Sequence, residues 1–394
     1  MIRLRCVVSV RAGVRVCAGL CLVSSLACDA LLLGEQGSPI GLEENLRPPP
    51  STEDGWAVSE LETEGIRGEL IRGLVRQLQL DPRRVDSFLI VRNGKLVLES
   101  YFGGWERERL HDLRSCSKSV NALLVGIAIE QGALEGVQRP MLELFPEYAA
   151  LADPSGSGAL ANDGKAAITV EHLLTMSAGL RWNQSTFENS DDRNDEGALE
   201  RSDDWLRYVL SREMQDPPGE VFRYNSGCSA LLAGIVKATT GQHSNVFAEQ
   251  HLFGPLGIRR YYWEQQADGL CNAWAGLSLR PRDMAKIGQL MLDGGRWQDQ
   301  QLVSVEWVER STTALQDDGE VGYGYQWWTE EVAAGSPAER TQVRVHSARG
   351  NGGQYIFIVP GLNAVVVFTG SNYAPLDQSA PYRFMTGVVL PAMM

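Results

Sequence analysis

The stretch Ser115-Cys116-Ser117-Lys118 begins the predicted helix from which both the fold and the chemistry of this chain are inferred. Residues at i and i+3 share one face of a helix, so the Lys118 amine can reach back over the Ser115 hydroxyl. Apolar residues follow at helical spacing and predict an amphipathic helix with one buried stripe: Val120, Leu123, Leu124 and Ile127. A buried lysine loses its charge more readily than a solvated one, and a neutral amine accepts a serine proton. The stretch therefore predicts a nucleophile beside its base.

A second interpretation of the same stretch is open at this point. Serine is a common first residue of a helix, where its side chain caps the backbone, and lysine is common on helix surfaces. A capping Ser115 with a solvated Lys118 would give the same four letters. Other parts of the chain have to decide between the two interpretations.

Composition limits the possible partners of the protein. The chain has 394 residues, of which 44% are hydrophobic, enough for a sizeable core in one large domain or two joined ones. A net charge of -13 argues against nucleic acid and anionic membranes as partners but leaves a small-molecule substrate open. The acidic stretch 187–204 is expected to be a solvated loop and not a metal site. The five histidines show no ligand spacing, so no metal and no cofactor are expected.

The N-terminal residues predict export. Four arginines precede an apolar run from Val16 to Ala27, which is too short to span a bilayer and is typical of a signal peptide. We expect a signal peptide over 1–27, a tether over 28–55 and a periplasmic or extracytoplasmic location. Cys28 directly follows the expected cleavage site and suits lipid attachment. A free form and a form anchored to the membrane through Cys28 alone both stay open.

The two ends of the chain predict strands, and the middle predicts helices. Residues Ser87 to Tyr101 predict a β-hairpin that turns at Asn93-Gly94. Three more strands are expected over 341–346, 355–359 and 364–369, followed by a helix from about Ala380. The sequence therefore predicts an α+β protein: an antiparallel five-stranded sheet flanked by N- and C-terminal helices, with a mostly helical inserted domain. We expect the sheet domain over 56–114 and 320–394 and the helical domain over 115–319.

A second motif, Tyr224-Asn225-Ser226, lies in a loop just before a predicted helix over 230–239. An ammonium group nearby favours the ionised form of a phenol, and a phenolate can move protons between a serine and a leaving group. A buried tyrosine beside a capping asparagine is the alternative interpretation.

A third motif is the glycine-rich stretch 348–354, between two predicted strands. Glycine lets a substrate come close to a strand edge, and an N–H at that edge, together with the N–H of Ser115, is suited to form an oxyanion hole. The alternative is a flexible hairpin loop.

Taken together and in this order, the three motifs resemble those of the penicillin-recognising serine hydrolases. The resemblance is to the branch that contains class C β-lactamases, D-alanyl-D-alanine carboxypeptidases, lactamase-like esterases and 6-aminohexanoate-dimer hydrolases, and it covers about residues 60 to 390. Three further segments look like recurring segments of this family: 172–180, 280–286 and 323–328.

The resemblance implies a β-lactamase/transpeptidase-like fold and a role for each matched residue. Ser115 would be the acylated nucleophile, Lys118 its base and Tyr224 the proton relay. Ser226 takes the place where the lactamases usually carry asparagine. The third motif falls on 348–350, so the lysine or histidine that often starts it is missing. The residues implied in the oxyanion hole and substrate binding are Asn351, Gly350, Gly352 and Ser226.

The expected function is that of a serine hydrolase, which cleaves ester or amide bonds through an acyl-enzyme. A cell-wall D-alanyl-D-alanine carboxypeptidase or β-lactamase is the first alternative, although the missing cationic residue weakens the case for β-lactams. His346 and Arg349 are the charged candidates nearby, and the sequence does not show where they point. A non-catalytic penicillin-binding-like module is the more remote alternative.

Overall fold

The computed structural model describes residues 42–80, 85–152, 164–184, 190–335, 340–373 and 378–394. The chain divides into two units, Met1–Glu43 and Glu44–Met394, and the fold below is that of the second unit. The predicted signal peptide, Cys28 and the first part of the predicted tether lie outside the described residues.

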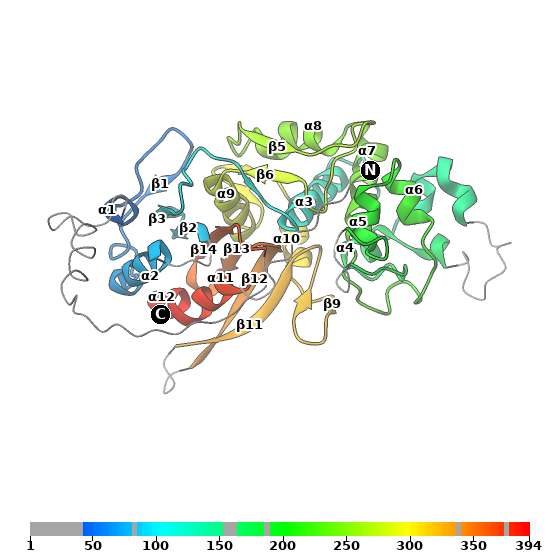
Figure 1. Ribbon diagram of the computed structural model, residues 1–394. Coiled ribbons are helices and arrows are strands. Elements are labelled where there is room, and N and C mark those ends of the chain that lie inside the picture. Colours follow the sequence, from blue (N-terminus) through cyan, green and yellow to red (C-terminus); the bar gives the residue numbers. More distant parts are fainter. Residues whose placement is uncertain (1–41, 81–84, 153–163, 185–189, 336–339, 374–377) are drawn as a thin grey trace, which may run out of the picture. The chain divides into compact units, whose positions relative to one another are not determined.

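A nine-stranded sheet runs through the second unit (Figure 1). Every neighbouring pair is antiparallel except the first, which is parallel. In sheet order the strands are β1 (Ala57–Val58), β3 (Lys95–Tyr101), β2 (Val85–Arg92), β14 (Ala364–Gly370), β13 (Gln354–Val359), β12 (Thr341–Gly350), β11 (Trp328–Ala334), β10 (Gly322–Tyr323) and β9 (Gln316–Asp317).

The predicted sheet of five strands was therefore too small. The five predicted strands are present as β2, β3, β12, β13 and β14, and β11, β10, β9 and β1 extend the sheet on both sides. Strand β11 carries Glu330 and Glu331 in its middle and buries only alternate residues, so it lacks the apolar run that marks the other strands. The remaining three have two residues each, too few for a periodic pattern.

The predicted hairpin is confirmed. Strands β2 and β3 pair with Arg92 opposite Lys95. The two turn residues both have positive φ angles, 52° at Asn93 and 73° at Gly94, as a tight two-residue hairpin requires.

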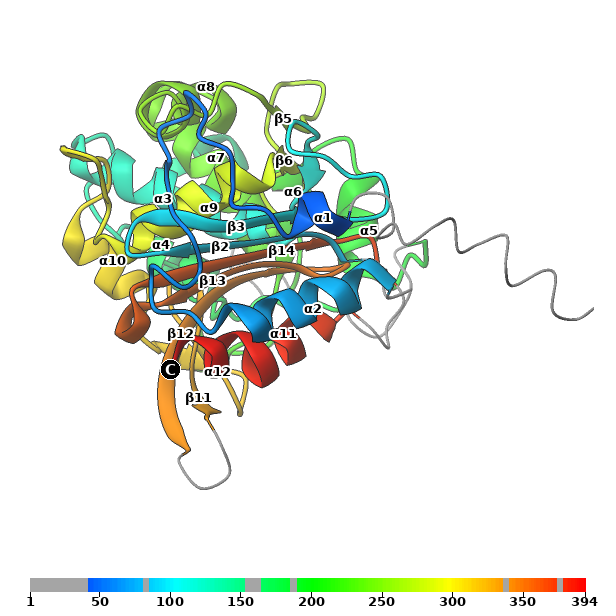
Figure 2. The same cartoon turned by 90° about the vertical axis from the view of Figure 1, so that its left-hand side faces the viewer.

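Both faces of the sheet are covered, which explains why its strands read as continuous apolar runs. Along β14, Val365 and Val367 join one core cluster, whereas Val366 and Phe368 join the other. Helix α2 (Gly68–Leu80) and the C-terminal helices α11 (Ala380–Phe384) and α12 (Leu390–Met393) cover one face (Figure 2). Helices α3 (Cys116–Glu130) and α9 (Pro281–Leu292) lie on the other face. The predicted flanking by terminal helices is thus confirmed.

Most of the remaining elements lie between β3 and β11 in the sequence. The helices are α1 (Leu42–Asn45), α4 (Val170–Leu174), α5 (Asp195–Glu200), α6 (Trp205–Leu210), α7 (Ser226–Thr240), α8 (Ser244–Ala248) and α10 (Val305–Ser311). Short 3-10 or π turns span Met141–Leu144, Pro146–Ala152, Lys165–Ala167, Glu249–Phe253, Pro360–Leu362 and Met385–Val389. One small sheet contains β4 (His111–Asp112), β6 (Leu277–Leu279) and β5 (Tyr261–Trp263). A second small sheet contains β7 (Arg296–Trp297) and β8 (Gln300–Gln301). In the described part of the chain, no helix has the length and apolar character needed to cross a membrane. The proposed domain boundaries at 114/115 and 319/320 stay predictions.

Helix α3 is not amphipathic, contrary to the prediction from its sequence. Every residue from Cys116 to Ala128 is buried, polar ones included. The helix packs against β12 and β13 of the sheet and against α7 and α8, so it has no solvent face. The serines and the lysine in its first turns are therefore inside the protein.

The described part of the acidic stretch, residues 190–204, differs from the prediction, and residues 187–189 lie outside the described residues. The stretch was expected to be a solvated loop, but it contains helix α5, which begins after Asn194. The Asn194 side chain accepts a hydrogen bond from the N–H of Gly197 and so caps the helix.

Candidate active site

Ser115 lies at the N-cap position of α3, directly after a residue in a strained conformation. Arg114 has a φ of 48°, in the left-handed region that costs a non-glycine residue roughly 1–2 kcal/mol. Asp112 holds it there, because its carboxylate accepts from the Arg114 backbone N–H at 2.9 Å and pairs with the guanidinium at 2.9 Å. The Ser115 side chain makes no capping hydrogen bond, so its hydroxyl is not used to start the helix.

The Lys118 amine contacts the Ser115 hydroxyl directly. Lys118 Nζ lies 3.0 Å from Ser115 Oγ and donates a second hydrogen bond to the carbonyl oxygen of Trp274 at 2.7 Å. Only 1% of the lysine is exposed, so it is not the surface lysine of the alternative interpretation. Burial lowers the pKa of Lys118 from its usual value to about 8, although the nearby Glu196 carboxylate opposes this shift. The ammonium group is thus poised to lose its proton near neutral pH.

Tyr224 completes the group of side chains from the first two motifs. Asn225 is the N-cap of α7, its side chain accepting from the N–H of Gly227 at 2.8 Å, and this fixes the loop that presents Tyr224. The Tyr224 ring lies with its centre 5.1 Å from Lys118 Nζ, and its hydroxyl hydrogen-bonds the Ser115 side chain.

The expected phenolate at Tyr224 is not supported. Burial raises the pKa of the Tyr224 phenol above its usual value, and the hydrogen bond with Ser115 offsets only part of that rise. Tyr224 therefore keeps its proton at neutral pH.

Aromatic side chains form one side of the site. Trp328 is half-buried and stacks on Tyr224 with ring centres 5.9 Å apart and an angle of 20°. Phe222 and Tyr323 pack edge-on against Trp328. Four other tryptophans are at most 5% exposed and are packed in the core: Trp182, Trp205, Trp274 and Trp327. Trp328 is therefore the tryptophan of this set with surface left beside Tyr224.

The glycine-rich motif brings the end of β12 to the start of α3. A Cβ on Gly350 would lie 2.4 Å from the carbonyl oxygen of Leu113, two residues before Ser115, so this contact requires glycine. Gly352 has a φ of 88°, and a Cβ there would lie 2.6 Å from the Tyr373 ring. Asn351 between them is exposed, and its carbonyl oxygen accepts from the Gln354 side chain at 3.2 Å. The oxyanion role of these residues stays a prediction.

Ser226 is directed to a partner that the sequence did not suggest. Its hydroxyl donates to the Glu196 carboxylate at 2.7 Å, and its backbone N–H donates to Gln184 Oε1 at 2.8 Å. Glu196 thereby stands near the Ser115–Lys118 pair and acts on the pKa of Lys118. The only sequence signal for it was a helix start inside an acidic stretch. Among the described residues, no three His, Cys, Asp or Glu side chains are grouped as metal ligands.

The two charged candidates near the third motif are already engaged. His346 is buried and contacts the Thr329 hydroxyl at 2.8 Å, and burial lowers the pKa of its imidazole to about 4, so the ring is neutral at pH 7. Arg349 pairs with Glu330 and donates to Ser347 Oγ at 2.8 Å, with its guanidinium over the Trp328 ring. Neither residue supplies an unpaired positive charge to the site.

Comparison with known proteins places this chain in a family. The family model described as Beta-lactamase matches residues 72–385, and the chain belongs to that family. It is 28% identical over 335 residues to a 6-aminohexanoate-dimer hydrolase of Paenarthrobacter ureafaciens, covering 79% of each protein. The chain is thus a hydrolase of the β-lactamase family.

Solved structures agree with this fold. A putative 6-aminohexanoate-dimer hydrolase from Bacillus anthracis superimposes with a TM-score of 0.64 at 22% identity, covering 79% of this chain and 80% of the other. EstCE1, described as a hydrolase with promiscuous acyltransferase activity, gives a TM-score of 0.64 at 17% identity, covering 82% and 100%. At these identities the two structures support the fold alone.

Proposed function

We propose that this protein is a serine hydrolase that cleaves ester or amide bonds through an acyl-enzyme. Ser115 would be the nucleophile, Lys118 the general base and Tyr224 the proton relay. One observation carries the proposal: a lysine that is 1% exposed lies 3.0 Å from a serine hydroxyl that has no role in capping its helix. Both contacts of Lys118 are to uncharged oxygens, so no ionised group in direct contact holds its charge at that depth.

In the first half-reaction, neutral Lys118 takes the Ser115 proton as Oγ attacks the carbonyl carbon of the substrate. With a pKa of about 8, roughly a tenth of the lysine is neutral at pH 7. Tyr224 gives its own proton to the departing alcohol or amine and regains one from the Lys118 ammonium. In the second half-reaction, a water molecule loses a proton to the same pair and attacks the acyl-enzyme, which releases the acid and restores Ser115.

The surroundings of Ser115 favour esters or linear amides over β-lactams. Arg349, the cation within the third motif, is paired with Glu330, so it is not free to hold a substrate carboxylate. Trp328 and Phe222 offer an aromatic surface for an apolar acyl group. The curated relative is named for the 6-aminohexanoate dimer, a linear amide, and we include that compound among the candidate substrates.

A substrate panel tests the proposal. We expect the wild type to hydrolyse p-nitrophenyl acetate or butyrate, and Ser115→Ala to lose at least about 10³-fold of that rate. Ser117→Ala is the matched control. Ser117 is buried two residues further along the chain, and its hydroxyl accepts a hydrogen bond from the backbone N–H of Leu277. Equal rates for the wild type and Ser115→Ala would instead support a non-catalytic module.

The same panel separates the substrate classes. Nitrocefin and a D-Ala-D-Ala peptide represent the cell-wall alternative, and the linear 6-aminohexanoate dimer represents the amidase. We expect ester or linear amide turnover without nitrocefin turnover. Rapid turnover of nitrocefin or of the D-Ala-D-Ala peptide would reverse the assignment.

We also propose that the protein is exported. The support is the arginine-flanked apolar run before Cys28, as given by the sequence. Mass spectrometry of the mature protein from its native envelope should find residues 1–27 removed. An added diacylglycerol at Cys28 would identify the anchored form, whereas an intact N-terminus in the cytoplasmic fraction would contradict export.

A further inference from the structure

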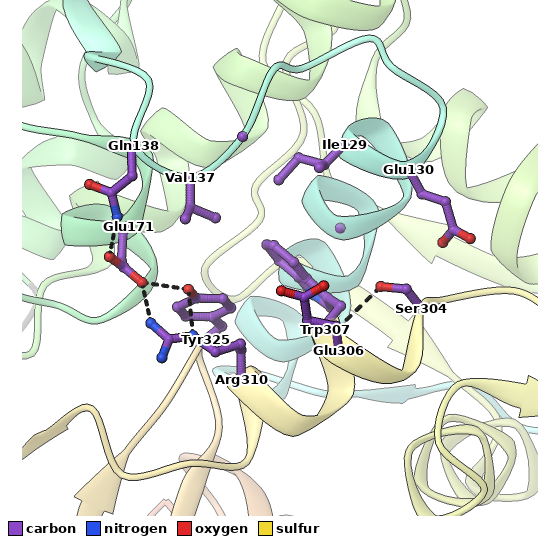
Figure 3. A pocket seen from close by; sticks show the side chains of 12 residues that line it. Ile129, Glu130, Val137, Gln138, Glu171, Ser304, Glu306, Trp307, Arg310 and Tyr325 are labelled. Atoms are coloured by element: carbon purple, nitrogen blue, oxygen red, sulfur yellow. Dashed lines mark hydrogen bonds and ion pairs between the residues drawn. The ribbon is translucent and has the colours of Figure 1, made fainter.

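A cavity of about 470 Å³ lies at the far end of α3 from Ser115 (Figure 3). It is formed by the last turns of α3, the loop 136–138, the start of α10 and Tyr325. At 1.5 Å per residue, the α3 residues that line it stand roughly 17 to 22 Å along the helix from Ser115. None of its lining residues belongs to the Ser115 site. Its volume falls in the range of small-molecule sites.

The wall of this cavity is aromatic and firmly packed. Trp307 and Tyr325 have ring centres 4.9 Å apart. The Trp307 ring presses on the backbone of α3, because a Cβ on Gly126 would lie 2.6 Å from its atoms. Ile129 and Val137 complete the apolar surface beside these rings (Figure 3). The Trp307 indole N–H is buried and has no hydrogen-bond partner within the described part of the chain.

One side of the cavity has its charges fully matched. The Glu171 carboxylate accepts hydrogen bonds from the Tyr325 hydroxyl at 2.5 Å, from Arg310 at 2.6 Å and from Gln138 at 2.5 Å. Arg310 is the cation of the lining, and this network neutralises it (Figure 3).

The other side carries negative charge without a counter-ion. Glu130 at the end of α3 and Glu306 on α10 both line the cavity and are exposed. Neither forms an ion pair with another described residue. An apolar aromatic wall thus stands beside two carboxylates that remain available.

We propose that this cavity binds a small organic cation with an apolar body, of the arylalkylammonium class. The apolar part would lie against Trp307 and Tyr325, and the ammonium would face Glu130 and Glu306. The two carboxylates attract the ammonium group, and the apolar side chains of the wall cover the apolar body, so each part of the ligand meets a complementary part of the lining. This site goes beyond the hydrolase proposed above and does not depend on it.

Calorimetric titration of the full-length Ser115→Ala protein tests the proposal, because that variant cannot turn over a probe. The probe is 2-phenylethylammonium, and 2-phenylethanol is its neutral counterpart of similar shape. We expect the cation to bind at least about 10-fold more tightly than the alcohol. The preference should fall to within about 2-fold in Glu130→Gln/Glu306→Gln, whose changes are exposed and leave the fold intact.

Two controls keep the outcome unambiguous. Glu309→Gln removes a carboxylate from the same helix outside the cavity and should leave the preference unchanged. Val137→Trp fills the cavity and should abolish saturable binding of the cation. Equal affinity for the alcohol, an unchanged preference in the double variant, or no saturable binding of the cation would each overturn the proposal.

Discussion

Two fully buried lysines in this protein meet opposite surroundings. Lys286 on α9 lies 3.5 Å from the Asp283 carboxylate, which is also held by Arg280 at 2.7 Å. Lys118 on α3 contacts a serine hydroxyl and a backbone carbonyl, and neither of these is ionised. Burial lowers the pKa of both lysines, but only Lys286 has a carboxylate in direct contact to oppose it. The comparison supports the proposal that Lys118 is a base, because its immediate contacts do not hold its proton, whereas the contacts of Lys286 favour a structural role.

Replacing the lysine of the active site should have the largest effect. We expect Lys118→Met to lower kcat/KM for p-nitrophenyl esters by at least about 10³-fold, because within the described part of the chain Lys118 is the lysine that contacts Ser115. Stability in urea should be unchanged or higher, since the substitution removes a desolvation cost. Activity within about 10-fold of the wild type would show that Lys118 is not the base.

Removing the Tyr224 hydroxyl tests whether this residue donates a proton to the leaving group. Tyr224→Phe keeps the ring beside Trp328 and removes only the hydroxyl. We expect a loss of about 10²-fold for linear amides and a smaller loss for p-nitrophenyl esters, whose leaving group needs no proton. The measurement is the ratio of the two losses in one preparation, and equal losses would contradict a role in protonating the leaving group.

Removing the carboxylate beside Lys286 should lower the stability of the protein and leave its activity unchanged. Asp283→Asn leaves Lys286 buried without a carboxylate in contact, while Arg280 keeps Glu108 at 2.9 Å, so we expect a loss of about 3 kcal/mol in the free energy of unfolding. The specific activity of the folded fraction should stay within about 2-fold of the wild type. A catalytic defect at full stability would place this cluster in the chemistry and weaken the comparison.

The smallest expected effect is a shift in the pH dependence of kcat/KM when the Glu196 carboxylate is removed. If Lys118 accepts the serine proton, only its neutral form is active, and kcat/KM should rise with pH through an apparent pKa near 8. Glu196→Gln removes the charge that raises the pKa of Lys118 most, so the rise should move to lower pH. Glu309→Gln at the surface is the control. A profile that moves to higher pH would contradict the assignment.

The sequence predicted best those elements whose structure depends on residues that are neighbours in the chain. The Asn93-Gly94 turn, the apolar strands and helix α9 over 281–292 all follow from neighbouring residues. Strand β11 was missed because its middle carries Glu330 and Glu331, and only its pairing with β12 makes it a strand. The extra edge strands likewise exist through pairing and not through their own composition.

The candidate site was predicted in its residue types but not in its electrostatics. Spacing was enough to suggest that Lys118 reaches Ser115, since both lie in one helical turn. That Lys118 is buried on all sides, and that Tyr224 keeps its proton, depends on packing by α7 and the sheet. Glu196 reaches Ser226 across 30 residues of sequence, a distance over which no local pattern applies.

The central claim is that Ser115 is a nucleophile activated by a neutral Lys118. Its most direct test is the rate of labelling by a fluorophosphonate between about pH 6 and pH 10, followed by peptide mapping. We predict a single adduct on Ser115, formed at a rate that rises with pH through an inflection near 8 and is lost in Lys118→Met. An adduct on another serine, or a labelling rate on Ser115 that does not depend on pH, would contradict the account.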